Sequence, residues 1–361
     1  MNILFCSEGF IIDGVASYNL YLSAALQQAG HRVAILGRWA GFKGFQQRHK
    51  DTGVEVIQCV SATADNTWFI KQAVKFQPDI LITDSRRSFP LARKARESTG
   101  AKLITVFHDP PQLDRTDKRS IHHIMAASDA WVTSEKPIWE ELKKIKTNLP
   151  THWIQRPITG MVQPTALPPK DPFNVLCLGR ISRWKSPGIR NLVEKATQLK
   201  SAIPSLTITV IGGGPRRISV LINAIKANIR KKQRFIRILG TQVNPQLWFK
   251  HATVVCAGAT SAIEAILSQR PVIAFSGFWM GKITTENMSS AVNTHFGERS
   301  GDFYVKDDPD VVIRELIDLY HSWNQEKMTE QVNTLRQQLA PDFDSNLIAE
   351  SFKRLFEKLN K

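Results

Sequence analysis

The stretch FNVLCLGRISRWKSP, residues 173–187, decides the fold that we expect for this chain. Its apolar run Val175–Leu178 is too short for the interior of a helix and lies between a proline and a glycine, so it predicts a buried strand. Arg180 and Lys185 follow where the next helix would begin. A strand-to-helix loop of an α/β sheet often holds a phosphate, because helix-start N–H groups and cationic side chains point to the same place. The stretch therefore indicates either a diphosphate-binding loop or an ordinary solvated basic loop.

Short apolar runs alternate with helical patterns in both halves of the chain, which indicates parallel sheets covered by helices. The strands expected in the first half are Ile3–Cys6, Val33–Leu36, Val54–Cys59, Ile80–Thr83, Leu103–Phe107 and Ala130–Thr133. Those expected in the second half are Val175–Leu178, Leu206–Ile211, Phe235–Leu239, Thr253–Cys256 and Val272–Phe275. Helices are expected between the strands, beginning with Val15–Ala29, and at the end of the chain, as Asp307–Trp323, Gln325–Leu339 and Asp344–Leu359.

The stretch from Pro150 to Pro172 interrupts this alternation with six prolines among polar residues. Such a composition cannot continue a helix or a sheet, so it predicts a linker between two domains. We therefore expect an N-terminal Rossmann-like domain over residues 1–155, a linker over 156–172 and a C-terminal Rossmann-like domain over 173–340. The final helix, within 341–361, is expected to pack back toward the N-terminal domain.

The composition is that of a soluble globular protein, since 42% of the 361 residues are hydrophobic and 22% are charged. No apolar run approaches the roughly 20 residues that a membrane-spanning helix needs. The first ten residues, MNILFCSEGF, lack a basic region and a long apolar region, so they indicate a first strand and not a signal peptide. Four cysteines lie singly in strand-like runs, as reduced core thiols of a cytoplasmic protein do, without the spacing of a metal site: Cys6, Cys59, Cys177 and Cys256.

Positive charge is concentrated in the second half of the chain. The net charge is +16, and eleven Lys or Arg residues but no Asp or Glu lie between Lys195 and Ile263, most densely in Lys226–Arg237. Such a field favours an anionic partner, namely a nucleotide, a lipid surface or a nucleic acid, whereas the alternative is a solvated helix face that serves solubility. We expect no nucleic-acid binding, because the sequence has no recognisable module for it and no aromatic–basic interleaving in the densest segment.

Five further positions stand where ligands of open α/β sheets bind, beyond the carboxyl ends of strands. Gly14 begins the first helix, where a glycine either lets a ligand approach the backbone or only turns the chain. His108 follows the fifth strand in FHDPP, although most histidines are surface residues without a role. Gly213 lies in the run GGGP, a weak nucleotide-approach signal without GxGxxG spacing. Ser261 begins the helix that carries Glu264 one turn in.

Together these motifs resemble glycosyltransferases of the GT-B type in the large retaining family 4, over nearly the whole length of the chain. The motifs that carry the resemblance are GVASYNLYLSAALQQAGHRV near the start, the pair His108–Asp109, and then GRISRWKS, VIGGGP, ILGTQV and AIEAILSQRPVIAF, in the family's order and approximate spacing. The resemblance implies two Rossmann-like domains facing across a cleft. It also implies retaining transfer of a hexose from a UDP- or GDP-type nucleotide sugar to a glycan, lipid-linked or small-molecule acceptor.

The resemblance implies roles for individual residues. Arg180 and Lys185 match the two cations that bind the donor diphosphate and stabilise the departing nucleotide. Glu264 matches the second glutamate of a paired motif, which accepts hydrogen bonds from the ribose hydroxyls, and Val243 falls where the backbone meets the nucleobase. The expected catalytic residues are His108, which would orient the transferred sugar, Arg180 and Lys185. The expected donor-binding residues are Gly14, Gly213, Val243, Ser261 and Glu264.

Fixed cations can substitute for a metal in this chemistry, because breaking a sugar–diphosphate bond builds negative charge on the leaving group. We therefore expect no metal and no cofactor, the nucleotide sugar being a substrate, and we expect Asp342–Asp344 (DFD) to cap the last helix. The chain departs from the family at Cys256, where the first glutamate of the paired motif would contact the donor sugar. A thiol cannot replace those bonds. Either the sugar is held differently, through Gly277–Met288, or catalysis is impaired.

Two other functions remain open: a GT-B-fold epimerase acting on a nucleotide sugar, and a non-catalytic nucleotide-sugar-binding partner of another transferase. The acceptor is the least determined part, and either a soluble acceptor or an anionic membrane carrying a lipid-linked sugar is compatible with the sequence. Basic residues of the N-terminal half that favour the membrane are Arg86, Arg87, Arg93, Lys94 and Arg96. The expected location is the cytoplasm, with or without peripheral contact at the inner face of the membrane.

Overall fold

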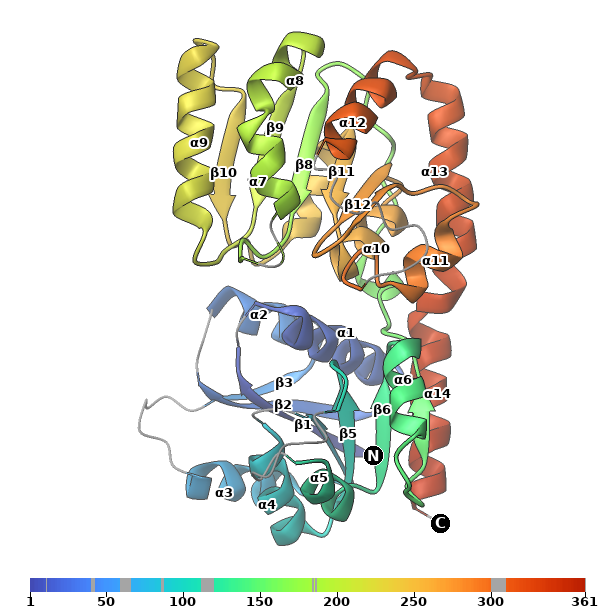
Figure 1. Ribbon diagram of the computed structural model, residues 1–361. Helices are drawn as coiled ribbons and strands as arrows, with labels where there is room; N and C mark the ends of the chain where they lie inside the picture. Colours follow the sequence, from blue (N-terminus) through green and yellow to red (C-terminus); the bar gives the residue numbers. More distant parts are fainter. Residues whose placement is uncertain are drawn as a thin grey trace. The chain divides into compact units, whose positions relative to one another are not determined.

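The computed structural model describes residues 1–10, 12–39, 43–58, 66–85, 88–111, 120–183, 185, 187–299 and 310–360. The chain divides into two compact units, of which unit 1 comprises Met1–Met161 and Phe343–Lys361, and unit 2 comprises Val162–Asp342. Each unit has a sheet of mainly parallel strands with helices packed against it (Figure 1). The α/β architecture expected from the sequence is therefore confirmed.

The sheet of unit 1 has seven parallel strands in the order β3-β2-β1-β4-β5-β6-β7. Its strands are β1 Asn2–Gly9, β2 Arg32–Trp39, β3 Glu55–Gln58, β4 Ile80–Asp84, β5 Lys102–Phe107, β6 Ala130–Thr133 and β7 Thr151–Trp153. Its helices are α1 Gly14–Gln28, α2 Lys43–Asp51, α3 Asn66–Phe76, α4 Phe89–Thr99, α5 Ile121–Ala127, α6 Lys136–Lys143, the 3-10 helix η1 Thr159–Met161, and α14 Ser345–Leu359. Helices α1 and α2 lie on one face of the sheet and α3, α4 and α5 on the other, which explains why β1 and β4 are almost wholly buried (Figure 1).

The sheet of unit 2 has six strands in the order β10-β9-β8-β11-β12-β13. They are β8 Asn174–Leu178, β9 Thr207–Ile211, β10 Ile236–Gly240, β11 Val254–Ala257, β12 Val272–Phe275 and β13 Trp279–Lys282. All pairs are parallel except β12 with β13, which is antiparallel. The helices are α7 Pro187–Glu194, α8 Ala196–Ala202, α9 Arg217–Arg230, η2 Pro245–His251, α10 Ala259–Leu267, α11 Met288–Asn293, α12 Val311–His321, α13 Gln325–Leu339 and η3 Ala340–Phe343.

Each strand expected from the sequence coincides with an observed strand, although β1 and β2 extend further, to Gly9 and Trp39, and Cys59 lies outside the described residues. Two observed strands were not expected. Strand β7 lies within the proline-rich stretch that we expected to be irregular, and this expectation is wrong. The prolines flank the strand, so the three residues of β7 keep the N–H groups with which an edge strand pairs with β6. Strand β13 was not expected because two of its four residues are a glycine and a lysine. It is identified as a strand by its antiparallel pairing with β12.

The last helix, α14, belongs to unit 1. Asp344 is its N-cap and accepts hydrogen bonds from the backbone N–H groups of Asn346 and Leu347, both at 2.9 Å. The capping role expected for the DFD sequence is thus confirmed. The start of α14 is joined to η1, because the hydroxyl of Ser345 accepts a hydrogen bond from Gly160 N at 2.9 Å. Along its length α14 packs on α1.

A fully buried guanidinium, that of Arg270, holds the start of unit 2 against the end of α10. Its Nε donates to Phe249 O at 2.6 Å, and its Nη1 donates to Thr165 O at 3.0 Å and to Gln269 O at 2.8 Å. Its Nη2 donates to Thr165 Oγ1 at 2.5 Å and to Ala166 O at 2.8 Å. Burial lowers the pKa of this side chain to about 10, so it stays charged at neutral pH. The five bonds compensate for the lost hydration of the cation.

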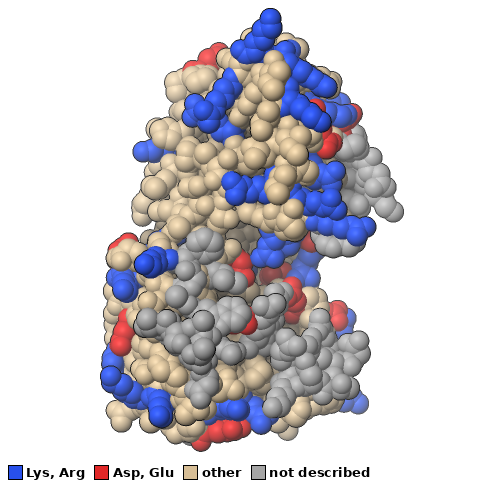
Figure 2. Space-filling model, turned by 90° about the vertical axis from the view of Figure 1, so that its left-hand side faces the viewer, with Lys and Arg blue, Asp and Glu red and all other residues tan. Residues whose placement is uncertain are grey.

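Lys and Arg side chains gather on the face of unit 2 that Figure 2 shows, around a largely uncharged area. Three of the cysteines, Cys6, Cys177 and Cys256, are buried free thiols, as the sequence predicts. No helix in the described part of the chain is long and apolar enough to cross a bilayer. Among the same residues, no cluster of three or more His, Cys, Asp and Glu side chains is arranged to hold a metal ion.

Candidate functional site

The carboxyl edge of the unit 2 sheet collects most of the site residues expected from the sequence. Parallel strands that share a sheet bring the loops after them to one edge, which is where open α/β sheets bind ligands. Arg180 follows β8, Gly213 follows β9, Val243 follows β10, and Ser261 and Glu264 lie in α10, which follows β11. Lys185 lies between β8 and α7. Six of the eight expected residues are therefore in unit 2, at one edge of its sheet.

The glycine run after β9 is required by close packing of two backbones. A Cβ atom on Gly212 would lie 1.9 Å from Gly179 O, and one on Gly214 would lie 2.4 Å from Ile181 O. The backbone N–H of Ile181 donates to Gly213 O at 2.8 Å, which joins the loops after β8 and β9. The run thus fixes the loop that carries Arg180. Contact of Gly213 with a donor stays a prediction, because packing within the unit already explains the glycines.

The two expected diphosphate-binding cations differ in their surroundings. The Arg180 side chain is exposed and forms no ion pair with the residues that the structure describes. The Lys185 ammonium forms an ion pair with the carboxylate of Glu298, and 44% of the Lys185 side chain and 24% of the Glu298 side chain are exposed. The loop after β8 therefore offers one unneutralised guanidinium and one ammonium that already has an anionic partner.

Glu298 is placed by a tight turn that immediately precedes it. The three residues of the turn, His295, Phe296 and Gly297, all have left-handed backbone conformations, with φ of 50°, 52° and 83°. The turn lies against the start of α10, because the Ala259 N–H donates to His295 O at 3.1 Å. Two successive non-glycine residues in this region cost roughly 1 kcal/mol each or more. The turn brings a carboxylate from far along the chain to the loop after β8, and sequence reasoning missed it.

Glu264 and the segment after β10 are joined by a residue that sequence reasoning also missed. Glu264 is almost fully buried, and its Oε1 accepts a hydrogen bond from Gln246 Nε2 at 3.3 Å. Gln246 lies in η2, shortly after Val243, which is half-buried. The structure thus joins Glu264 to the segment that follows Val243. Nothing in the sequence indicates that the glutamine three residues after Val243 contacts Glu264.

Cys256 does not face the expected site. Its thiol is fully buried in the core of unit 2, and in the pairing of β11 with β8 it lies opposite Cys177. A hydrogen bond with Cys177, followed by burial, raises the pKa of the Cys256 thiol well above its ordinary value. The residue eight positions before Glu264 is therefore a strand residue whose thiol is buried in the core of unit 2.

The two expected residues of unit 1 lie at the carboxyl edge of the other sheet. Gly14 is the first residue of α1, and the preceding Asp13 caps this helix by accepting a hydrogen bond from Ala16 N at 2.8 Å. Among the residues that the structure describes, none has an atom within 4 Å of a Cβ atom built on Gly14. Packing within unit 1 therefore does not require a glycine at this position, and the open space leaves room for a ligand.

His108 follows β5 and belongs to a small cluster of polar and aromatic side chains. The ring of Tyr18 from α1 meets the ring of His108 edge to face, with 4.9 Å between their centroids. The guanidinium of Arg156 lies 5.9 Å from the centre of the Tyr18 ring, and its Nη2 donates to Ser134 Oγ at 3.2 Å. Burial raises the pKa of Tyr18. Tyr18 and Arg156 fix the surroundings of His108, and neither was identified from the sequence.

Residues 12–157 match the family model described as Glycosyltransferase Family 4. A search of curated proteins finds no match. A search of solved structures finds the same fold over the whole chain. A glycosyltransferase from Rickettsia africae ESF-5 has a TM-score of 0.66 at 15% identity, with 100% of this chain and 98% of that chain covered.

Several of the similar structures contain UDP or UDP-glucose. The Anabaena protein Alr3699/HepE in complex with UDP-glucose has a TM-score of 0.69 at 13% identity, with 99% of this chain and 100% of that chain covered. The pneumococcal O-GlcNAc transferase GtfA in complex with UDP and GlcNAc has a TM-score of 0.67 at 14% identity, with 99% of each chain covered. The shared fold confirms the GT-B architecture implied by the resemblance, and residues 12–157 are similar to Glycosyltransferase Family 4, as the motifs of the sequence indicate.

Proposed function

We propose that the chain transfers a hexose from a UDP-sugar to a glycan, lipid-linked or small-molecule acceptor, with retention of anomeric configuration. The observation that carries this proposal is the exposed guanidinium of Arg180, which forms no ion pair with any described residue and shares the loop after β8 with Lys185, at the carboxyl edge of the unit 2 sheet. Two of the similar structures hold UDP-glucose or UDP with GlcNAc, which favours UDP over GDP as the donor nucleotide. Glu264 would bind the ribose and the backbone near Val243 the base.

In this proposal the cations act on the leaving group. As the bond between the anomeric carbon and the diphosphate breaks, its electron pair passes to the phosphate oxygen, where Arg180 and Lys185 stabilise the negative charge. The acceptor hydroxyl attacks the same face of the sugar, and its proton passes to the departing phosphate. No protein nucleophile and no metal takes part. Gly213, Ser261 and Gly14 would approach the phosphates, and His108 would orient the sugar.

Glu298 is the carboxylate that we propose to contact the donor in place of a residue at position 256. It already lies within ion-pair reach of Lys185, and the turn before it is held against the start of α10. A diphosphate that binds Lys185 would displace or rotate this carboxylate toward the donor. The sugar hydroxyls are groups to which a carboxylate can accept strong hydrogen bonds.

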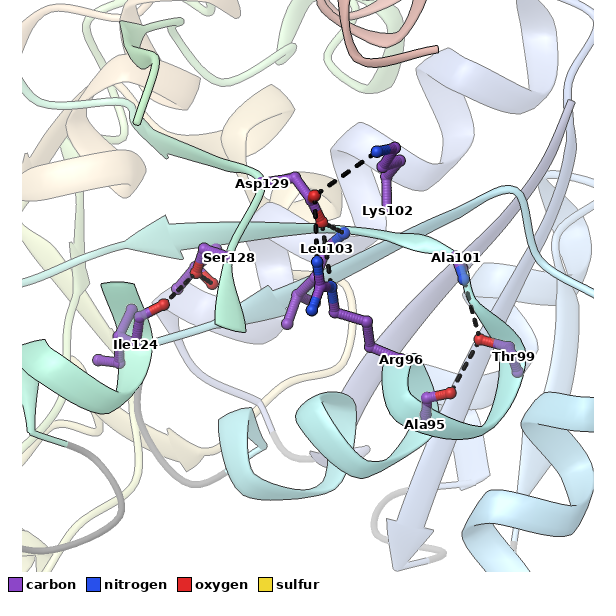
Figure 3. A network of polar contacts seen from close by, with 10 residues as sticks. Ala95, Arg96, Thr99, Ala101, Lys102, Leu103, Ile124, Ser128 and Asp129 are labelled. Carbon is purple, nitrogen blue, oxygen red and sulfur yellow. Dashed lines mark hydrogen bonds and ion pairs between the residues drawn. The ribbon is translucent and has the colours of Figure 1, made fainter. Parts of the chain in front are cut away.

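The basic residues of unit 1 give limited support for membrane contact by that unit. Arg93 pairs with Glu97 at 3.0 Å. Arg96 binds Asp129 through Nε at 3.1 Å and Nη2 at 3.2 Å, in a network that also includes Lys102 (Figure 3). Two of the expected cations therefore already have anionic partners, and Arg86 and Arg87 lie outside the described residues. Membrane contact through this surface, with Lys94, stays a prediction, as does a cytoplasmic location.

The proposal is tested by incubating the protein with UDP-, GDP- and ADP-sugars, with and without a panel of glycan and lipid-linked acceptors. We expect release of UDP that is accelerated by an acceptor and unaffected by EDTA, and a product whose anomeric configuration, read by NMR, equals that of the donor. An epimerised nucleotide sugar formed without an acceptor would identify the epimerase alternative. Tight UDP binding without turnover on any acceptor would identify the non-catalytic partner.

A further inference from the structure

Helix α9 presents an apolar stripe to solvent. The exposed fractions are 70% for Ile218, 38% for Leu221, 46% for Ile222, 48% for Ile225 and 70% for Ile229. Four of these residues are spaced by four, three and four positions, which places them in one line along a helix. Five of the ten large apolar side chains that are exposed in the described part of the chain lie on this one helix. Scattered exposed apolar residues are ordinary, but a contiguous stripe marks an interaction surface.

The opposite face of α9 already supplies the contact with the sheet. Its buried residues are Val220, Ala224 and Ala227, all small or medium in size, and they join the core of unit 2. The helix therefore needs none of its isoleucines for packing within the unit. Strand β10, beside it, is the edge strand of the sheet, so no further element of this sheet extends beyond α9 on that side (Figure 1).

Cations border the stripe on both sides. Exposed basic residues on α9 and at its ends are Arg216, Arg217, Lys226, Arg230 and Lys232. Within the described residues none of them forms an ion pair, and no acidic residue occurs in the sequence between Lys195 and Ile263. Figure 2 shows this face of unit 2, in which Lys and Arg surround an uncharged area. Among the described residues these five cations are therefore not neutralised by ion pairs, and the nearby carboxylate of Glu194 accepts a hydrogen bond from Asn223.

We propose that α9 is an interfacial helix that seats unit 2 on an anionic lipid bilayer. Its isoleucines would enter the boundary between headgroups and acyl chains, while the flanking cations bind lipid phosphates. A nucleic acid would use the cations but leave the isoleucines in water. A second copy of the chain, docked by the same face, would bring two basic rims together. An anionic bilayer would bind both the exposed isoleucines and the flanking cations.

This surface differs from the basic residues of unit 1, and it does not depend on the donor site. The experiment measures co-flotation of the full chain with phosphatidylcholine vesicles and with vesicles that also contain phosphatidylglycerol. We expect binding to the anionic vesicles that weakens as salt rises. The triple variant Ile222→Gln, Ile225→Gln, Ile229→Gln should bind at least about tenfold more weakly, because each isoleucine withdraws apolar area from water. The matched control Leu347→Gln, at a side chain on α14 that is 61% exposed, should bind as the wild type does.

The contribution of the cations is measured with Lys226→Gln, Arg230→Gln, which should weaken anionic binding and flatten its salt dependence. Unchanged UDP affinity and melting temperature in the triple variant would separate lipid binding from donor binding and from folding. Absence of wild-type binding to anionic vesicles, or equal flotation of the triple variant, would overturn the proposal. So would a wild-type dimer, seen by analytical ultracentrifugation, that the triple variant disperses, since α9 would then be a protein contact.

Discussion

Replacing Glu298 by glutamine should tighten the binding of UDP. The Glu298 carboxylate pairs with the Lys185 ammonium and lies 3.6 Å from His295 Nε2. A diphosphate that uses Lys185 must compete with this carboxylate and bear its repulsion. Glutamine keeps the size of the side chain and removes the charge, so the anion that competes with a diphosphate for Lys185 is lost without a change in packing.

The expected gain in UDP affinity is estimated from the distance between the charges and from the exposure of the two side chains. Two unit charges 4 Å apart interact by about 1 kcal/mol in bulk water and by about 4 kcal/mol at the effective dielectric of a protein surface. Both side chains are partly exposed, at 44% and 24%, and the phosphates would lie beyond direct contact with Glu298, so the lower part of this range applies. We expect a gain of about 1 kcal/mol, which is about fivefold in affinity.

The assay is titration calorimetry with UDP at low and high ionic strength. The gain should shrink as salt rises, because both groups are reached by solvent. The control is Glu194→Gln, which removes another half-exposed carboxylate of unit 2, the partner of Arg190 at 3.8 Å, and should leave UDP affinity unchanged. Unchanged or weaker binding of UDP by Glu298→Gln, with an unchanged melting temperature, would show that Lys185 does not exchange Glu298 for a diphosphate.

Two further predictions concern stability. Arg270→Met should lower the free energy of unfolding of unit 2 by about 4 kcal/mol, because it leaves buried carbonyl oxygens without a donor; urea denaturation giving a loss below about 1 kcal/mol would contradict this. Burial, together with the charge of Arg48, lowers the pKa of His49 from 6.5 to about 3. Below pH 6.5 the unfolded chain therefore binds a proton that the folded chain does not, so stability should be retained above pH 6.5 and fall toward pH 3 by up to about 1.4 kcal/mol per pH unit. His49→Gln should lose this part of the slope, and parallel curves for wild type and variant would refute the assignment.

The strands were predictable because buried parallel strands are short, nearly uninterrupted apolar runs, as in β11. The order and register of the strands could not be predicted, and the register determines where Cys256 lies. The resemblance implies a donor contact at this position, whereas the structure shows the thiol buried in the core opposite Cys177. The common location of Arg180 and Lys185 in the loop after β8 could be predicted, because the two residues are close together in sequence. Glu298 could not, since it is 113 residues from Lys185 and approaches through a left-handed turn.

Helix α9 shows a different limit of prediction from sequence, which concerns the choice of the buried face. The sequence showed its charge, and a regular apolar face is normally the face that a helix buries. Here small residues such as Ala224 and Ala227 fill the contact with the sheet, and the isoleucines face outward. Only the structure distinguishes the two faces, because both are apolar.

The central claim is that Arg180 binds the diphosphate of the donor. Calorimetry with UDP on the wild type, on Arg180→Ala and on Lys327→Ala, a control that removes one exposed cation of α13, tests it most directly. We predict clear binding by the wild type and the control, and at least about 20-fold weaker binding by Arg180→Ala, as expected for the loss of charge-assisted hydrogen bonds to phosphate. Equal affinity of Arg180→Ala and the wild type, with both folded, would contradict the account.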